Sequence, residues 1–198
     1  MFLGAVAAPR PSKGFDGKIG LFHVGEAYTA QRRSKYHERG EEYMVNINMD
    51  GDVFMDMMEN EVVPAILKKC KWAKRVIVQF DSAGGHRVAE SVDYLNAVGA
   101  TKKPQILFIT QPSRSPDVNV LDLGIWRSMS SRVTTVKYDR SSSLSMDQRI
   151  INAVEEMWKE YDPNVLHNIF VTLKLILYAI RDNNGGNNFK LPHRPNED

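Results

Sequence analysis

The sequence predicts a mixed α/β (α+β) protein in which helices flank a mixed β-sheet. Two short apolar runs at 2–8 and 18–24, separated by a turn-rich connector, are typical of an antiparallel pair of strands. Two later apolar runs, at 75–80 and 105–109, alternate with helical patterns, which indicates strands with helical crossovers. Acidic residues follow both later strands, so a function is first sought at those strand ends.

Helices are expected where apolar residues recur every third or fourth position. Asp50 can cap the first helix, and Pro64 lies inside its pattern and is expected to kink it. Ser145 can cap a later helix that ends before Pro163. The expected helices cover 50–70, 88–99, a stretch that begins near 119, 145–162 and 164–181.

Three parts are expected along the chain: a core at 1–140, C-terminal helices packed on that core at 141–182, and a flexible polar tail at 183–198. Between 25 and 42 the periodicity disappears and the charge rises, so this stretch is predicted to be a loop or an excursion from the sheet. Arg32 and Arg33 lie in it. They belong either to a solvated surface loop or to an arm that contacts phosphates.

Composition is that of an ordinary globular protein. Of the 198 residues, 42% are hydrophobic and 25% are charged, and the formal net charge of +2 requires any DNA contact to come from local basic patches. One cysteine, Cys70, cannot form an internal disulfide, which is typical of intracellular proteins. The first residues lack the features of a signal peptide. The apolar stretch at 165–180 is shorter than the roughly 20 residues of a membrane span, so a packed helix and no membrane contact are expected.

Two acids stand at strand ends. Asp81 directly follows the strand at 75–80, and Asp122 follows the strand at 105–109 through a proline-rich turn that also contains Asp117. Carboxylates in this arrangement suit Mg²⁺ or Mn²⁺, which take oxygen ligands from proteins and from substrate phosphates. Two such ions roughly 3.5–4 Å apart would support phosphodiester cleavage.

The same acids also have purely structural interpretations. Asp122 could lie in the first turn of a helix that begins near Asn119, where an acid contributes about 0.3–1 kcal/mol. Asp81 could belong to an ordinary turn, and His86 could cap a helix or face solvent. A zinc site is not predicted, because Cys70 and the five histidines show no ligand spacing.

Two sequence blocks contain these acids, DSAGGH at 81–86 and SPDVNVLD at 115–122. They resemble the second and third acidic blocks, Asp-Asn-Ala-x-x-His and Ser-Pro-Asp-Leu-Asn-x-x-Asp, of the catalytic domain of mariner-like (DDE/DDD) transposases. Between Asp81 and Asp122 lie 40 residues, near the spacing of the subgroup whose third acid is aspartate. Segments at 15–20, 61–66 and 185–193 also resemble the family, so the similarity extends over nearly the whole chain.

The resemblance implies an RNase H-like fold in which three acids bind two Mg²⁺ (or Mn²⁺) ions, and an activity that cuts element ends and joins them to target DNA. Carried over by motif, Asp81 is the second acid and Asp122 the third, whereas Asp117 belongs to the Ser-Pro-Asp turn. The family's first acid lies on an earlier strand, in an Asp-Glu-Lys-Trp-Phe-like motif that is not found in this sequence. Asp16 lies in a different block and does not replace it, so catalysis by this chain on its own is not expected. Ser82 replaces the family's usual Asn, and the helical DNA-binding region that precedes the family's catalytic domain has no counterpart in the sequence.

The missing strand also affects the expected stability. In the family's sheet this strand is central, so without it the strands at 2–8 and 75–80 each lose a hydrogen-bonding partner. Two apolar edges are then exposed unless they pair directly or recruit another chain. We therefore expect a marginally stable or aggregation-prone product.

Three functions remain as hypotheses. The first is a truncated mariner-like transposase catalytic domain for DNA transposition, inactive on its own, whose implied partners are terminal inverted repeat DNA and another transposase chain, and whose implied location is the nucleus. The second is a non-catalytic DNA-binding or transposase-interacting protein that uses Arg32, Arg33, Lys102 and Lys103 as DNA contacts. The third is an unrelated magnesium phosphatase or nuclease that uses Asp81 and Asp122.

Overall fold

The protein has a mixed α+β structure with small sheets. The computed structural model describes residues 1–81, 88–137, 144–186 and 188–189. The strands are β1 (Phe2–Val6), β2 (Lys18–His23), β3 (Gly25–Thr29), β4 (Glu42–Asn46), β5 (Arg75–Phe80) and β6 (Gln105–Thr110). The α-helices are α1 (Gly51–Met57), α2 (Val63–Lys69), α3 (Val88–Ala100), α4 (Trp126–Lys137), α5 (Met146–Glu160) and α6 (Pro163–Asp182). Short 3₁₀ or π segments are η1 (Pro11–Lys13), η2 (Met58–Val62), η3 (Pro116–Val118) and η4 (Leu121–Ile125).

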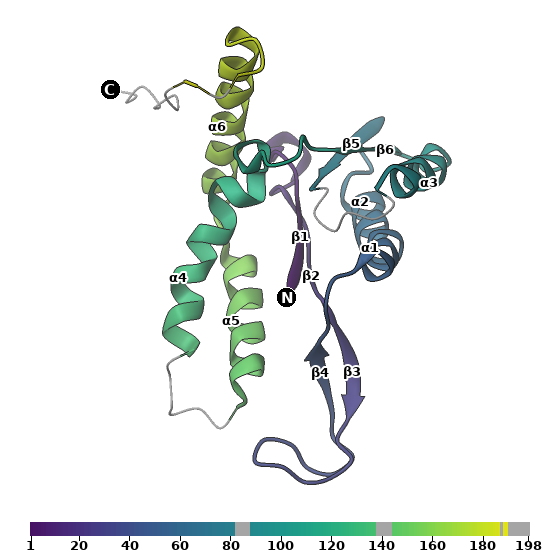
Figure 1. Cartoon of the computed structure of the whole chain (residues 1–198), viewed down its shortest axis with the longest axis vertical. Helices are drawn as coiled ribbons and strands as arrows, with labels where there is room; N and C mark the ends of the chain where they lie inside the picture. The colour runs from purple at the N-terminus through teal and green to yellow at the C-terminus, as the bar shows by residue number, and fades with distance from the viewer. Residues whose placement is uncertain (82–87, 138–143, 187, 190–198) are drawn as a thin grey trace.

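β1 separates two hydrophobic cores. Its side chains alternate between the two faces of the strand, so Leu3 and Ala5 pack in a core formed with α1–α3 and β5–β6, whereas Phe2 and Val6 pack in a core formed with α4–α6. Figure 1 shows β1 and β2 between these two groups of helices. β2 pairs with β1 in antiparallel fashion, with Phe22 opposite Leu3, as the sequence predicted.

The segment from β5 through α3 to β6 also follows the prediction. β5 and β6 are parallel neighbours, with Arg75 opposite Gln105 and Phe80 opposite Thr110. Ile106 and Phe108 are almost fully buried in the first core. Continuous apolar runs of this kind carry a strong strand signal, which is why both strands were placed to within one residue.

One helical stretch runs from 51 to 69 and changes its hydrogen-bonding pattern in the middle. The Asp50 side chain accepts from the backbone N–H of Val53 at 2.9 Å, which confirms the predicted cap. The π segment η2 then precedes Pro64, which lies in the first turn of α2. Because proline cannot donate to the carbonyl four residues earlier, a π turn is a common local adjustment. The hydrogen bonding therefore changes in η2, next to Pro64, where the sequence predicted a kink.

Helices α4, α5 and α6 form the layer on the other side of β1–β2 (Figure 1). The Ser145 hydroxyl accepts from the N–H of Gln148 at 3.2 Å, which confirms the predicted start of α5. Ile125, Met129 and Leu166 are buried between these helices. The predicted domain boundary at 140 and most of the predicted tail lie outside the described residues.

α6 spans 20 residues from a cap at Asp162 and extends one residue beyond the predicted 164–181 at each end. By length and composition it is the one helix in the described part of the chain that could cross a membrane, and 11% of its most apolar stretch is buried. Leu166 and Phe170 pack in the second core, whereas Leu177 and Tyr178 are exposed. Ile176, in the second half, is fully buried, so α6 buries one side along its length and presents other apolar side chains to solvent.

The stretch at 25–42 was predicted to be a loop or an excursion from the sheet, and the loop alternative is wrong for 25–29, which form β3. β3 and β4 pair in antiparallel fashion, with Gly25 opposite Asn46 and Thr29 opposite Glu42. The ring of Tyr43 packs edge-on against that of Tyr28 at 5.6 Å. A two-stranded ribbon in solvent buries little apolar surface, so its sequence lacks the pattern by which the other strands were recognised.

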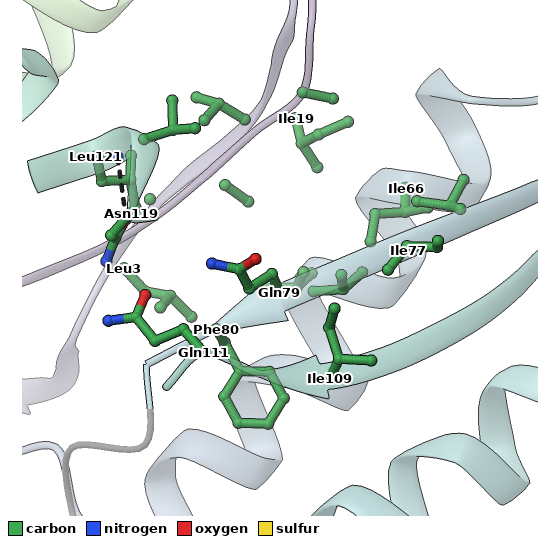
Figure 2. A pocket seen from close by; sticks show the side chains of 18 of the residues that line it. Leu3, Ile19, Ile66, Ile77, Gln79, Phe80, Ile109, Gln111, Asn119 and Leu121 are labelled. Atoms are coloured by element: carbon green, nitrogen blue, oxygen red, sulfur yellow. Dashed lines mark hydrogen bonds between the residues drawn. The ribbon is translucent and has the colours of Figure 1, made fainter. Parts of the chain in front are cut away.

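The strands of the described residues form three separate two-stranded sheets, whereas the sequence predicted one mixed sheet. β1 and β5 do not pair with each other, and a cavity lies between them (Figure 2). Paired strands lie about 4.7–4.9 Å apart, and a cavity between two strands prevents that spacing. The mixed composition was predicted correctly, while the continuity of the sheet was not.

Candidate metal centre

Asp81 directly follows β5, at the carboxyl end of the parallel β5–β6 pair. This end is fixed by the backbone N–H of Gln111, which donates to the carbonyl of Phe80 at 2.9 Å. Gln111 is the only buried polar residue in the described part of the chain, with 6% of its surface exposed. Asp81 therefore follows a strand end that a backbone hydrogen bond holds in place, and Asp81 itself is exposed to solvent.

Asp122 lies in η4, which the chain reaches through the turn after β6. The side-chain amide of Gln79 in β5 donates to the carbonyl of Val118 at 2.9 Å and so ties η3 to β5. The side-chain oxygen of Asn119 accepts from the N–H of Leu121 at 3.0 Å and begins the helical turn that contains Asp122. These two hydrogen bonds place the turn beside the strand that carries Asp81.

The carboxyl groups of Asp81 and Asp122 interact electrostatically. Partial burial raises the pKa of Asp122 above its ordinary value, and the negative charge of Asp81 raises this pKa further. A nearby like charge disfavours the ionised form of a carboxyl group, whereas a cation favours it. A cation that binds beside the carboxyl groups of Asp81 and Asp122 would therefore be stabilised.

The structural interpretation of Asp122 as a capping acid does not account for its pKa. Asp122 does lie in the first turn of a helical segment, as that interpretation required. However, it is the side-chain oxygen of Asn119 that accepts from a backbone N–H at this start, that of Leu121. An acid whose main interactions were with free N–H groups and the helix dipole would have a lowered pKa, and the pKa of Asp122 is raised.

A third protein ligand does not accompany the pair: within the described ranges, no group of three His, Cys, Asp or Glu side chains could hold a metal ion. Asp117 lies in η3, and His86 and Ser82 lie outside the described residues. Mg²⁺ commonly takes one or two protein carboxylates and completes its shell with water and substrate phosphates. The donor chemistry of Asp81 and Asp122 therefore fits a hard divalent cation.

The predicted DNA-contacting residues lie away from the acids and in two separate places. Lys102 and Lys103 precede the amino end of β6, whereas the acids lie beyond its carboxyl end, and a six-residue strand is about 20 Å long. Arg32 and Arg33 are exposed at the tip of the β3–β4 hairpin, which projects away from β5 and β6 (Figure 1). The structure brings the two acids together and leaves the four basic residues apart from them.

Two residues that position the acids were missed in the sequence. Gln79 is a polar residue in the run from Val76 to Phe80 that is otherwise apolar, and that exception was the available signal. Asn119 was noted only as a helix start, and its side chain accepts from the N–H of Leu121, the first residue of η4. Both residues act through the backbone of η3 and η4, so sequence spacing gave no direct indication of their partners.

Comparison of the chain with protein-family models, with curated proteins and with solved structures finds no match. Functional assignment therefore rests on the two acids, on the strand end and helical turn that hold them, and on the resemblance of the surrounding motifs.

Proposed function

We propose that this chain carries two of the three acids of a mariner-like, RNase H-like transposase core, with Asp81 and Asp122 as ligands for Mg²⁺ or Mn²⁺. The observation that carries the proposal is the interaction between Asp81, at the end of β5, and Asp122, in η4. A carboxyl group whose pKa is raised by burial and by a second carboxylate is a recognised sign of a functional site. The motifs around both acids support the same assignment.

The substrate of such a site is a DNA phosphodiester at the end of a transposable element. A bound cation would polarise a phosphate oxygen and activate the attacking water or hydroxyl. Asp81 and Asp122 would supply oxygen ligands from two different elements. The hydrogen bond between Gln79 and Val118 would hold those elements at a fixed separation.

On their own, residues 1–198 are expected to lack cleavage activity, because the described residues bring together two acids and the proposed chemistry uses three. The partners that follow from the proposal are terminal inverted repeat DNA and another transposase chain, in the nucleus. An open frame encoding an Asp-Glu-Lys-Trp-like strand directly upstream in the genome would supply the third acid.

Metal binding tests the proposal directly. Mn²⁺ is titrated into the purified chain while the signal of the free ion is followed by electron paramagnetic resonance. Weak binding is expected, and it should be lost in Asp81→Asn and in Asp122→Asn. Asp117→Asn is the matched control, because it removes one carboxylate from the neighbouring η3, and it should bind as the unchanged chain does. Equal binding by all four proteins would refute the proposed ligands.

Catalytic incompleteness is tested with a labelled terminal-repeat duplex in the presence of Mg²⁺. No nicking above background is expected. Nicking by the unchanged chain that disappears in Asp81→Ala would show that two acids suffice, and it would overturn this part of the proposal while supporting the site.

A second candidate function is DNA binding without catalysis, and one observation favours it. The tip of the β3–β4 hairpin presents Arg32, Arg33, Lys35 and Arg39 as exposed residues on a projecting arm. Arg33 forms an exposed ion pair with Glu38 at 3.1 Å. Within the described residues, Arg32 has no ion-pair partner and is the stronger candidate for a phosphate contact.

Salt titration of duplex affinity tests this second function. Affinity should fall as salt rises, and Arg32→Ala should reduce the logarithmic slope by about one phosphate contact. Lys102→Ala tests the separate basic site in the same way. Lys13→Ala, in η1, is a control that removes an exposed cation elsewhere. An affinity that does not depend on salt would exclude phosphate binding by these residues.

A further inference from the structure

Two tyrosines are exposed on the β3–β4 hairpin, which projects from the rest of the molecule (Figure 1). Tyr28, in β3, is 43% exposed, and Tyr36, in the loop between the two strands, is 45% exposed. Aromatic side chains contribute strongly to cores and to interfaces. Neither tyrosine belongs to either hydrophobic core of the described residues. Their rings are therefore available to a ligand.

Ring contacts hold the loop against the ends of the strands. The ring of Tyr43, which is opposite Tyr28 in the pairing of β3 with β4, packs edge-on against Tyr28 at 5.6 Å. The ring of His37 stacks on that of Tyr43, with the centroids 3.7 Å apart and the planes 6° apart. The Nδ1 atom of His37 lies 3.3 Å from a carboxylate oxygen of Glu41. The loop is thus folded back onto an aromatic column.

A hydrogen-bonded turn fixes the backbone that carries Tyr36. The Ser34 hydroxyl accepts from the N–H of Tyr36 at 3.3 Å and from that of His37 at 3.1 Å. The N–H of Ser34 donates to the carbonyl of His37 at 2.8 Å. An aromatic ring on a fixed backbone loses little conformational entropy when a ligand packs on it. Tyr36 is therefore a preorganised contact surface.

Positive charge is concentrated at the same loop. Residues 31–39 contain four exposed cations, Arg32, Arg33, Lys35 and Arg39, and one acid, Glu38. The Nζ atom of Lys35 lies 5.0 Å from the centroid of the Tyr36 ring. Within the described residues Glu38 is paired with Arg33, and the acids Glu26 and Glu42 lie on the strands. Phosphates would therefore be attracted to the loop and not to the strands.

Exposed rings beside cations are the combination that binds unpaired nucleotides. The cations contact phosphates while successive bases stack on the rings, and stacking tolerates any sequence because every base has a π face. In a duplex the faces of the bases are already covered by neighbouring bases. A duplex would therefore offer phosphates to the cations but no partner to the tyrosine rings.

We propose that the loop of the β3–β4 hairpin binds an unpaired stretch of DNA. Tyr28 and Tyr36 stack on bases, and Arg32, Lys35 and Arg39 contact the flanking phosphates. This inference rests on DNA binding by the hairpin, the second function proposed above, and it specifies which form of DNA the hairpin prefers.

α6 carries a tyrosine that serves as a matched comparison. Tyr178 is 44% exposed, and Lys174 and Arg181 lie 5.6 Å and 5.0 Å from the centroid of its ring. Arg181 is paired with Asp182 at 2.8 Å. This face of α6 therefore has an exposed ring but less positive charge than the hairpin loop, and it is not expected to bind DNA.

The test compares three labelled DNA ligands by fluorescence anisotropy with the whole chain. They are a thymidine oligonucleotide of about twelve nucleotides, an abasic strand of the same length, and a blunt duplex of the same length. The thymidine strand should bind about ten-fold or more tightly than the abasic strand, because one stacked base supplies about that factor. It should also outlast the duplex as salt rises, since stacking is not screened.

Two failures are distinguished by these ligands. Equal affinity for the thymidine and abasic strands, together with salt-dependent binding, would overturn the stacking inference and leave DNA binding by the hairpin in place. An absence of salt-dependent binding to all three ligands would refute the proposed DNA binding itself. A uridine oligonucleotide of the same length should bind no more tightly than thymidine. Markedly tighter binding of this RNA would assign the loop to RNA and overturn the proposal.

Variants locate the stacking ring. Tyr36→Leu should lower affinity for the thymidine strand about ten-fold and leave affinity for the abasic strand unchanged. Tyr36→Phe keeps the ring and should keep the affinity, and Tyr178→Leu should bind as the unchanged chain does. Because the turn uses only the backbone of Tyr36, unchanged hydrogen exchange in β3 and β4 should show that the hairpin remains folded. Equal losses in Tyr36→Leu and Tyr36→Phe, or in Tyr36→Leu and Tyr178→Leu, would overturn the proposal.

Discussion

The charge on Asp122 opposes folding, and this is unusual for an acid in the first turn of a helical segment. Burial and the nearby Asp81 both disfavour its ionised form, so its pKa is higher in the folded chain than in the unfolded chain. Between the two pKa values the folded state binds more protons, and stability therefore falls as pH rises through that interval. Residues that conflict with folding are common at functional sites, so an acid that lowers the stability of the folded chain at neutral pH is typical of a binding site.

Asp122→Asn should make the chain more stable at neutral pH. The carboxyl group has an ordinary pKa of 3.8, so the difference between variant and unchanged chain should be small below that pH, grow as pH rises through the raised pKa, and then stay constant. Because Asp122 is only partly buried and solvent screens its charge, we expect a gain of about 1 kcal/mol or less. Urea unfolding at a series of pH values measures it. Asp117→Asn is the control, and an equal gain there would remove the role of Asp81.

Gly4 is a second residue whose environment fixes its identity. A Cβ atom at this position would lie 2.8 Å from the ring of Trp126, so Gly4→Val should destabilise the chain by about 1–3 kcal/mol through overpacking. Gly51→Ala is the matched control, because nothing lies within 4 Å of its Cβ position at the start of α1. That change should raise stability by about 0.5–1 kcal/mol. A neutral Gly4→Val in urea unfolding would contradict the packing described for β1.

At the scale of elements, the strands that could be predicted are those whose neighbours bury them. β5 and β6 were recognised because both are short apolar runs before turns, and the cap residues Asp50 and Ser145 placed two helix starts. The β3–β4 hairpin could not be recognised, because its side chains face solvent and its stability comes from pairing. Of the candidate site, the sequence indicated Asp81 and Asp122 through their strand-end positions, but the Gln79 contact that brings η3 to β5 depends on tertiary structure.

The Asn96 side chain connects α3 to the outer edge of β6, and its contribution to stability can be tested. Asn96→Ala removes two hydrogen bonds to the backbone of Phe108. We expect a loss of roughly 1–3 kcal/mol, because the backbone groups of a buried residue are left unsatisfied. Faster hydrogen exchange of the Phe108 amide should accompany it. Asp93→Ala, at an exposed position of the same helix, is the control and should leave that amide unchanged.

At the scale of the whole molecule, the described strands fall short of a continuous sheet, and both β1 and β5 have an open edge toward the same cavity. The resemblance implied that these two strands would lack a partner, and composition and periodicity could not have shown it. Local patterns report which residues are buried in an element. They do not report whether two elements far apart in the sequence touch each other or a third strand.

Open apolar strands predict self-association. The Ile77 side chain in β5 is 55% exposed, and a lysine on a strand edge opposes pairing between molecules. Ile77→Lys should therefore slow the rise of light scattering on warming. Leu177→Lys is the matched control, since it removes an exposed apolar residue from α6 instead of from a strand. Reversible unfolding of the unchanged chain as a soluble monomer, with no rise in light scattering, would contradict the expected self-association.

The alternation of side chains along β1 has a consequence for how the molecule melts. The five-residue strand β1 contributes side chains to both cores, so neither core keeps its packing if β1 detaches. Heat should therefore unfold the two halves in a single calorimetric transition, although they contain separate clusters of buried side chains. A substitution at Leu3 and one at Phe2 would weaken opposite halves of the protein and still lower the same melting temperature.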